Sequence, residues 1–64
     1  MTHKELLYLE DALKHEMNII GICNEMINLL EDEELASFIE KEVKKHEKME
    51  KELLSKMEGL ANDW

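Results

Sequence analysis

The sequence predicts an all-α protein that folds as a two-helix antiparallel hairpin. The 64 residues include no proline and only two glycines, and apolar residues recur at alternating spacings of three and four in both halves. An acidic run at positions 31–34 separates the two halves. We therefore predict one domain, 1–64, with a first helix over about 3–30, a turn at about 31–33 and a second helix over about 33–60.

The first helix carries an apolar stripe with one polar member. Thr2 is placed as the N-cap, with Glu5 three residues later as in a capping box, and the helix is expected to end near Leu30. Gly21 lies inside it at a cost of about 1 kcal/mol against Ala, which we interpret as room for a close helix approach. The stripe consists of Leu6, Leu9, Leu13, Glu16, Ile20, Cys23, Ile27 and Leu30.

The second helix repeats this arrangement. Asp32 can cap it, and Glu33 and Glu34 then stand in its first turn, where carboxylates face the positive end of the helix dipole. Its polar member is His46. The stripe consists of Leu35, Ala36, Ile39, Val43, His46, Met49, Leu53, Met57 and Leu60.

A hairpin that turns at the acidic run pairs positions whose numbers sum to about 62, using helix rise as the ruler. Glu16 then meets His46, and Leu13 meets Met49. We interpret Glu16 and His46 as a buried pair that fixes the register of the helices, with no cofactor. The alternative is a zinc or iron site made by Glu16, His46 and His15, since carboxylate and imidazole suit these metals.

A second, mostly apolar stripe runs along the first helix and would stay uncovered in a lone hairpin. Burying two stripes of one helix requires neighbours on two sides, which a four-helix bundle of two hairpins provides. We therefore predict a homodimer. The second stripe consists of Tyr8, Ala12, His15, Ile19, Ile22, Met26 and Leu29.

Composition narrows the function classes. Sixteen acidic residues against eight basic ones give a net charge of −8, which disfavours nucleic acid and anionic lipid as partners. The sequence has no apolar run near the roughly 20 residues needed to span a bilayer, and its one cysteine cannot form an intrachain disulfide. No phosphate-binding glycine loop, nucleophile elbow or catalytic triad is present. We expect a cytoplasmic, non-enzymatic protein.

Three segments of the sequence form a recognisable pattern: Ala12-Leu13-Lys14-His15-Glu16, Asp32-Glu33-Glu34-Leu35 and Lys44-Lys45-His46-Glu47-Lys48-Met49. Over about 5–59 this pattern resembles the ferritin-like helical hairpins of rubrerythrins and of the small spore coat protein F-like proteins of spore-forming Firmicutes. It implies a ferritin-like four-helix bundle. In di-iron members each hairpin supplies a Glu from its first helix and an ExxH from its second, and Glu16 and His46 match the first Glu and the His.

Val43 stands where that resemblance would place the bridging Glu, which argues against ferroxidase or peroxidase chemistry. The resemblance then implies a non-enzymatic structural module of the spore-coat-like branch, located in the spore coat with other coat proteins as partners. Two alternatives stay open. One is a metal-binding protein that holds iron or zinc at a degenerate di-metal site, and the other is a helical adaptor whose second stripe receives a helix of another protein.

Overall fold

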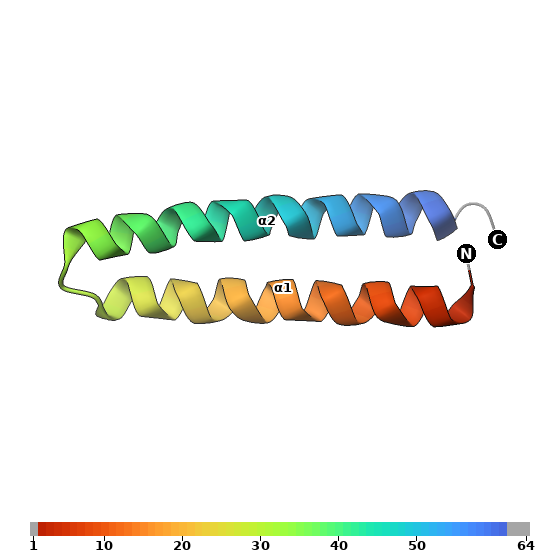
Figure 1. Cartoon of the computed structure of the whole chain (residues 1–64), viewed down its shortest axis with the longest axis horizontal. Helices are drawn as coiled ribbons and strands as arrows, with labels where there is room; N and C mark the ends of the chain where they lie inside the picture. The colour runs from red at the N-terminus through yellow and green to blue at the C-terminus, as the bar shows by residue number, and fades with distance from the viewer. Residues whose placement is uncertain (1, 62–64) are drawn as a thin grey trace.

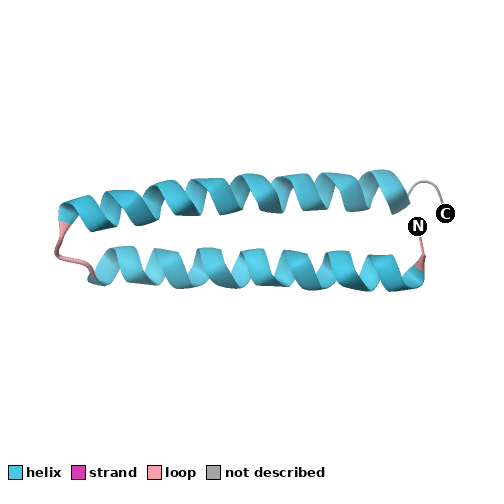
Figure 2. Cartoon of the chain, in the orientation of Figure 1, coloured by secondary structure: helices cyan, strands magenta, loops and turns pink. Residues whose placement is uncertain are grey.

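The computed structural model describes residues 2–61, with side chains through Gly59. Helix α1 spans His3–Leu29 and helix α2 spans Glu33–Ala61, and residues 30–32 connect them. The helices run side by side in opposite directions, so the start of α1 and the end of α2 lie at the same end of a rod of 49 × 15 × 11 Å (Figure 1). The described residues contain no strand (Figure 2). The predicted helical hairpin is confirmed.

Side chains at both helix starts satisfy backbone N–H groups that have no partner inside the helix. Thr2 Oγ1 accepts a bond from Glu5 N at 3.1 Å, and Glu5 Oε1 accepts one from Thr2 N at 3.1 Å, which completes a capping box. Asp32 Oδ1 caps α2 by accepting from Leu35 N at 3.0 Å. Helix α1 ends at Leu29, one residue earlier than expected, because Leu30 adopts extended backbone angles.

The contact between the helices is a single seam. Only Val43 and Glu16, at 6% and 9% exposure, are buried among the described side chains. The first stripe of α1 lies in this seam as predicted. The half-buried residues of the seam are Leu6, Leu9, Leu13, Ile20, Cys23, Ile27 and Leu30 from the first half, and Ala36, Ile39, His46, Glu50, Leu53 and Met57 from α2. A lone hairpin therefore encloses almost no core.

The predicted stripe of α2 needs correction at two positions. Met49 is 46% exposed and Leu35 is 45% exposed, whereas Glu50 is half-buried. From Val43 and His46, a regular alternation of fours and threes continues to Glu50, and helix geometry follows this spacing rather than the apolarity of Met49. Met49 therefore stands beside the seam, not opposite Leu13. The side chain of Leu60 lies outside the described residues.

The interpretation of Gly21 as a site of close helix approach is wrong for this hairpin. A methyl group placed on Gly21 would meet nothing within 4 Å, because the residue lies on an exposed side of α1. Its backbone angles are ordinary, so no positive φ requires glycine there.

Candidate functional site

Glu16 of α1 and His46 of α2 meet at mid-height in the seam. His46 Nδ1 lies 2.5 Å from Glu16 Oε2, and an imidazole that carries its proton on Nδ1 donates it to the carboxylate. The predicted meeting of these two residues is confirmed. Among the described residues, no buried side-chain nitrogen or oxygen lacks a hydrogen-bond partner, so this polar layer is internally satisfied.

Val43, three residues before His46 on the same stripe, is the most buried side chain of the described chain. It contributes only hydrocarbon to the polar layer. A carboxylate at position 43 would add a third metal ligand, but the side chain there is the aliphatic group of Val43. The donor set that one chain offers at this point is therefore one imidazole and one carboxylate.

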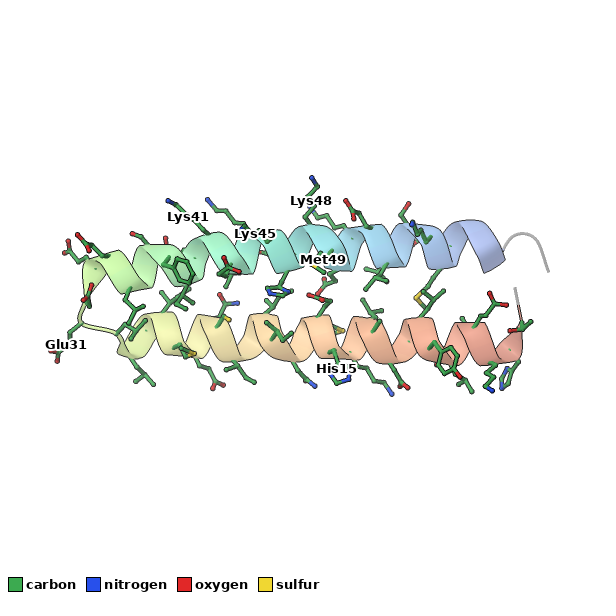
Figure 3. The ribbon with its side chains drawn as sticks, in the orientation of Figure 1. His15, Glu31, Lys41, Lys45, Lys48 and Met49 are labelled. Atoms are coloured by element: carbon green, nitrogen blue, oxygen red, sulfur yellow. The ribbon has the colours of Figure 1, made fainter. Side chains whose placement is uncertain are left out.

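His15 does not join the pair. Its side chain is exposed and lies on the side of α1 away from α2 (Figure 3). In the described part of the chain, no three His, Cys, Asp or Glu side chains come together as a metal site would need. A metal site that includes His15 would need groups from another molecule.

A second feature is an exposed face that both helices share, which we call the open face. Each member stands one residue before a seam position, which is a rotation of about 100° on each helix, and in an antiparallel pair the two rotations point to the same side. The α1 members are Tyr8, Ala12, His15, Ile19, Ile22, Met26 and Leu29, and the α2 members are Leu35, Phe38, Glu42, Lys45, Met49, Glu52 and Lys56. A shallow hollow on this face has Ala12 of α1 and Met49 and Lys56 of α2 among its lining residues, which confirms that the two sets adjoin.

The open face is apolar mainly on α1 and toward the turn. Ile22 is 58% exposed, Leu29 is 82% exposed and Phe38 is 57% exposed. Toward the middle of α2, Lys45 Nζ pairs with Glu42 Oε1 at 3.2 Å, and Met49 follows one turn later (Figure 3). Large apolar side chains in such a continuous exposed band mark an interaction surface.

The opposite side of the hairpin, which we call the polar face, carries more polar side chains than the open face. Its members are mostly charged or amide side chains, with three apolar exceptions in Leu7, Met17 and Leu54. The polar members include Glu10, Lys14, Asn24, Asn28, Glu40, Lys44, Glu47 and Lys51. Only one broad side of the rod is therefore suited to an apolar partner.

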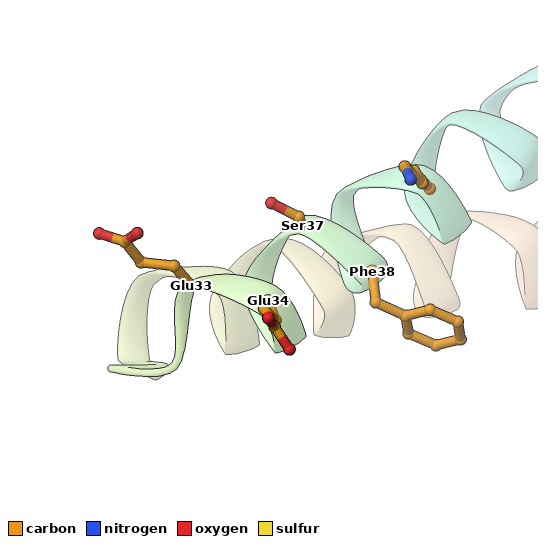
Figure 4. A pocket seen from close by; sticks show the side chains of 5 residues that line it. Glu33, Glu34, Ser37 and Phe38 are labelled. Carbon is orange, nitrogen blue, oxygen red and sulfur yellow. The ribbon is translucent and has the colours of Figure 1, made fainter.

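Sequence reasoning missed the contribution of Phe38. Its ring projects from α2 and borders a surface hollow whose other lining residues are Glu33, Glu34, Ser37 and Lys41 (Figure 4). All five residues belong to the first turns of α2, so this hollow is a surface feature of one helix. The available signal was the spacing: Leu35 and Phe38 are three residues apart and precede the seam residues Ala36 and Ile39 by one.

No family model matches the chain, and neither a curated protein nor a solved structure matches it. Within the described residues, neither helix is both long and apolar enough to cross a membrane.

Proposed function

We propose that the chain is a non-enzymatic structural module that works as a homodimer, in which two hairpins pack through their open faces into a four-helix bundle. The observation that carries this proposal is the contrast between the two sides of the seam. The described part of the lone hairpin buries only Val43 and Glu16, while the open face exposes a band of large apolar side chains. A chain this small needs further burial to be stable.

The accessible surface area of the chain is consistent with burial against a second copy. The chain, of 7.6 kDa, exposes 5254 Å², whereas a compact monomer of this mass exposes roughly 4,300 Å². The excess is close to the roughly 800 Å² that each partner buries in a protein–protein interface of standard size. Packing one broad face of the rod against a second copy would remove about this much surface.

The charge of the chain sets a condition on this assembly. Each copy carries a net charge of −8, so two copies repel each other at long range. The apolar contact must outweigh this repulsion, and added salt should tighten the dimer by screening it.

The sequence resemblance supports a spore-coat-like role for the module, in which other coat proteins are further partners. In this role the Glu16–His46 pair sets the register of each hairpin and carries out no chemistry. A rod with one mostly apolar side and one mostly polar side is suited to packing in an assembly.

A second candidate function is metal binding, and the Glu16–His46 pair is the observation that favours it. A homodimer would bring two such pairs into one bundle, which doubles the nitrogen and oxygen ligands near its centre. Zinc or iron suits these donors. The buried Val43 leaves each half without a third ligand, so we rank this function second.

The test uses two matched substitutions. Ile22 on the open face and Met17 on the polar face lie on the same helix and are 58% and 56% exposed. Ile22→Glu removes an exposed apolar side chain from each copy and buries a charge in the proposed interface, and we expect it to weaken the dimer at least about 100-fold. Met17→Glu should leave the mass measured by light scattering unchanged. Equal effects of the two substitutions would contradict the proposal, and a wild-type monomer that binds a helix of another protein would favour the adaptor alternative.

A further inference from the structure

We infer that the two copies pack head to tail, so that the turn of each hairpin lies over the terminal ends of its partner. The two-fold axis then runs perpendicular to the helices and crosses α1 near Ile19. This inference rests on the proposed homodimer and specifies which of its two possible arrangements the chain encodes. The alternative arrangement places the two turns at the same end of the bundle.

The Glu16–His46 contact fixes which residues of the two helices lie at equal height along the rod. Because it fixes the internal register, residues of α1 and α2 whose numbers sum to about 62 lie at equal height along the rod. An axis that crosses α1 near Ile19 therefore crosses α2 near Val43. Each helix then lies antiparallel to its own copy, and the contacts on the two helices can be examined separately.

On α1 this axis brings apolar groups of the open face together. Positions whose numbers sum to about 38 face each other, so Ile19 lies against the partner's Ile19. Met26 lies over the partner's Ala12, and Leu29 lies over the partner's Tyr8. The remaining member, Ile22, lies over the partner's His15. Large side chains near the turn thus meet small or aromatic ones near the terminal end.

On α2 the same axis pairs opposite charges. Positions whose numbers sum to about 87 face each other, so Glu42 lies against the partner's Lys45. By symmetry Lys45 lies against the partner's Glu42. These two residues already form an ion pair within one chain, and the dimer would join two such pairs into a four-charge cluster of alternating sign.

The shape of the open face also fits the head-to-tail arrangement. The hollow on the open face is lined in part by Ala12, Met49 and Leu53, which lie just past the middle of the rod on the side of the termini. The exposed ring of Phe38 stands near the turn, and the rule that brings Glu42 to the partner's Lys45 also brings Phe38 to the partner's Met49. A protruding ring of each copy therefore meets the hollow of the other.

The alternative arrangement keeps apolar contact near the turn, where Leu29 lies close to the height of the partner's Leu35, but it lacks the charge pairing at mid-height. With both turns at one end, α1 of each copy lies along α2 of its partner at equal height. Ile22 then lies level with a point between the partner's Phe38 and Glu42, and Ile19 lies between the partner's Glu42 and Lys45. Burying aliphatic groups against charged groups forfeits apolar contact and leaves charges poorly solvated.

A distance between two spin labels separates the arrangements. Glu31→Cys in a Cys23→Ala background carries one nitroxide label at the exposed turn of each hairpin. The head-to-tail dimer places the two labels roughly 40 Å apart from helix rise, whereas turns at the same end place them roughly 20 Å apart or less. Double electron–electron resonance reads either value. The short distance would overturn the inference and leave the homodimer standing, whereas a monomeric chain would overturn the proposed function itself.

Charge exchange supplies an independent test. In a head-to-tail dimer, Glu42→Lys chains repel one another, Lys45→Glu chains do the same, and the two variants attract each other. Native mass spectrometry of an equimolar mixture, with one variant ¹⁵N-labelled, should show the mixed dimer above about three quarters of all dimers, given the modest worth of exposed ion pairs.

The matched control places the same charge changes on the polar face, as Glu40→Lys mixed with Lys44→Glu. Both residues are exposed and outside the inferred contact. The control mixture should form the mixed dimer at the statistical level of about half. A statistical level for the open-face mixture as well would overturn the head-to-tail arrangement.

Discussion

Glu16 and His46, thirty positions apart in the chain, form the one side-chain hydrogen bond between the two helices in the described structure. Glu16 is buried and His46 is half-buried, each within an otherwise mostly apolar stripe. Sliding one helix by a single turn would set His46 against Leu13 or Ile20 and Glu16 against Val43 or Glu50, so neither group would keep a partner of opposite kind, which carries a desolvation cost. The pair therefore selects one register among several that the apolar contacts alone would tolerate.

The pair can be tested by removing one or both members. Glu16→Leu or His46→Leu alone leaves a polar partner unpaired in the seam, and we expect a loss of about 2 kcal/mol in the free energy of unfolding. The double substitution should retain or raise the stability, because packed leucines replace a pair whose desolvation is costly. Urea denaturation at one fixed protein concentration measures all four proteins. A double variant that loses as much as the two single losses combined would contradict the register interpretation.

Metal addition distinguishes the register role from metal binding. We expect excess Zn²⁺ or Fe²⁺ to change the wild-type Tm by less than about 2 °C, because a ligand stabilises the folded state only in proportion to its binding. The Glu16→Leu/His46→Leu variant is the control and should respond equally. Stoichiometric metal in the purified protein that is lost on Glu16→Ala or His46→Ala would move the chain into the metal-binding class.

Gly21→Ala should stabilise the protein by about 1 kcal/mol, because alanine has less freedom to lose on helix formation. The new methyl group would meet nothing within 4 Å. Gly59→Ala is the control: it is equally unobstructed but stands near the end of α2, so its gain should be smaller. Thermal unfolding measures both. A loss of stability with Gly21→Ala would mean that a neighbour covers this side of α1 in the assembly.

The capping box should make the start of α1 sensitive to pH. Bonds from the Thr2 backbone and side chain hold the pKa of Glu5 below its ordinary value of 4.5. A lowered folded pKa stabilises the helix above the unfolded pKa, and this contribution is lost as the pH falls through the folded value. Thr2→Ala should cost about 1 kcal/mol at neutral pH. The first-turn amides of α1 should be less protected against hydrogen exchange in this variant than in the wild type at pH 7, and the protection should fall further in both proteins at pH 3, where Glu5 is protonated.

The sequence was sufficient to predict the hairpin and its register. Two stripes at helical spacing, each predicted with one polar member at mid-length, favour the antiparallel alignment that pairs Glu16 with His46. Local chemistry also placed the ends, since Thr2 and Asp32 are short polar residues that can accept from the first free N–H groups. These features depend on near neighbours or on periodicity, and both can be read along the chain.

Which residues of α2 face α1 was harder to predict. Met49 and Glu50 are adjacent, and the spacing from His46 permits either one to face α1. Apolarity favoured Met49, but the helix continues its alternation to Glu50, which leaves Met49 on the open face. His15 belongs to the same face for the same geometric reason. Neither residue could be placed until the rotation of each helix was known, because a difference of one position turns a side chain by about 100°.

The mass of the untagged wild-type protein in solution tests the central claim most directly. Multi-angle light scattering at micromolar concentration should report about twice the chain mass of 7.6 kDa, because in the proposed dimer each copy covers the open face of the other. Raising the salt concentration should strengthen the association. A well-dispersed monomer of 7.6 kDa that unfolds cooperatively at the same concentration would contradict the homodimer, and with it the four-helix bundle.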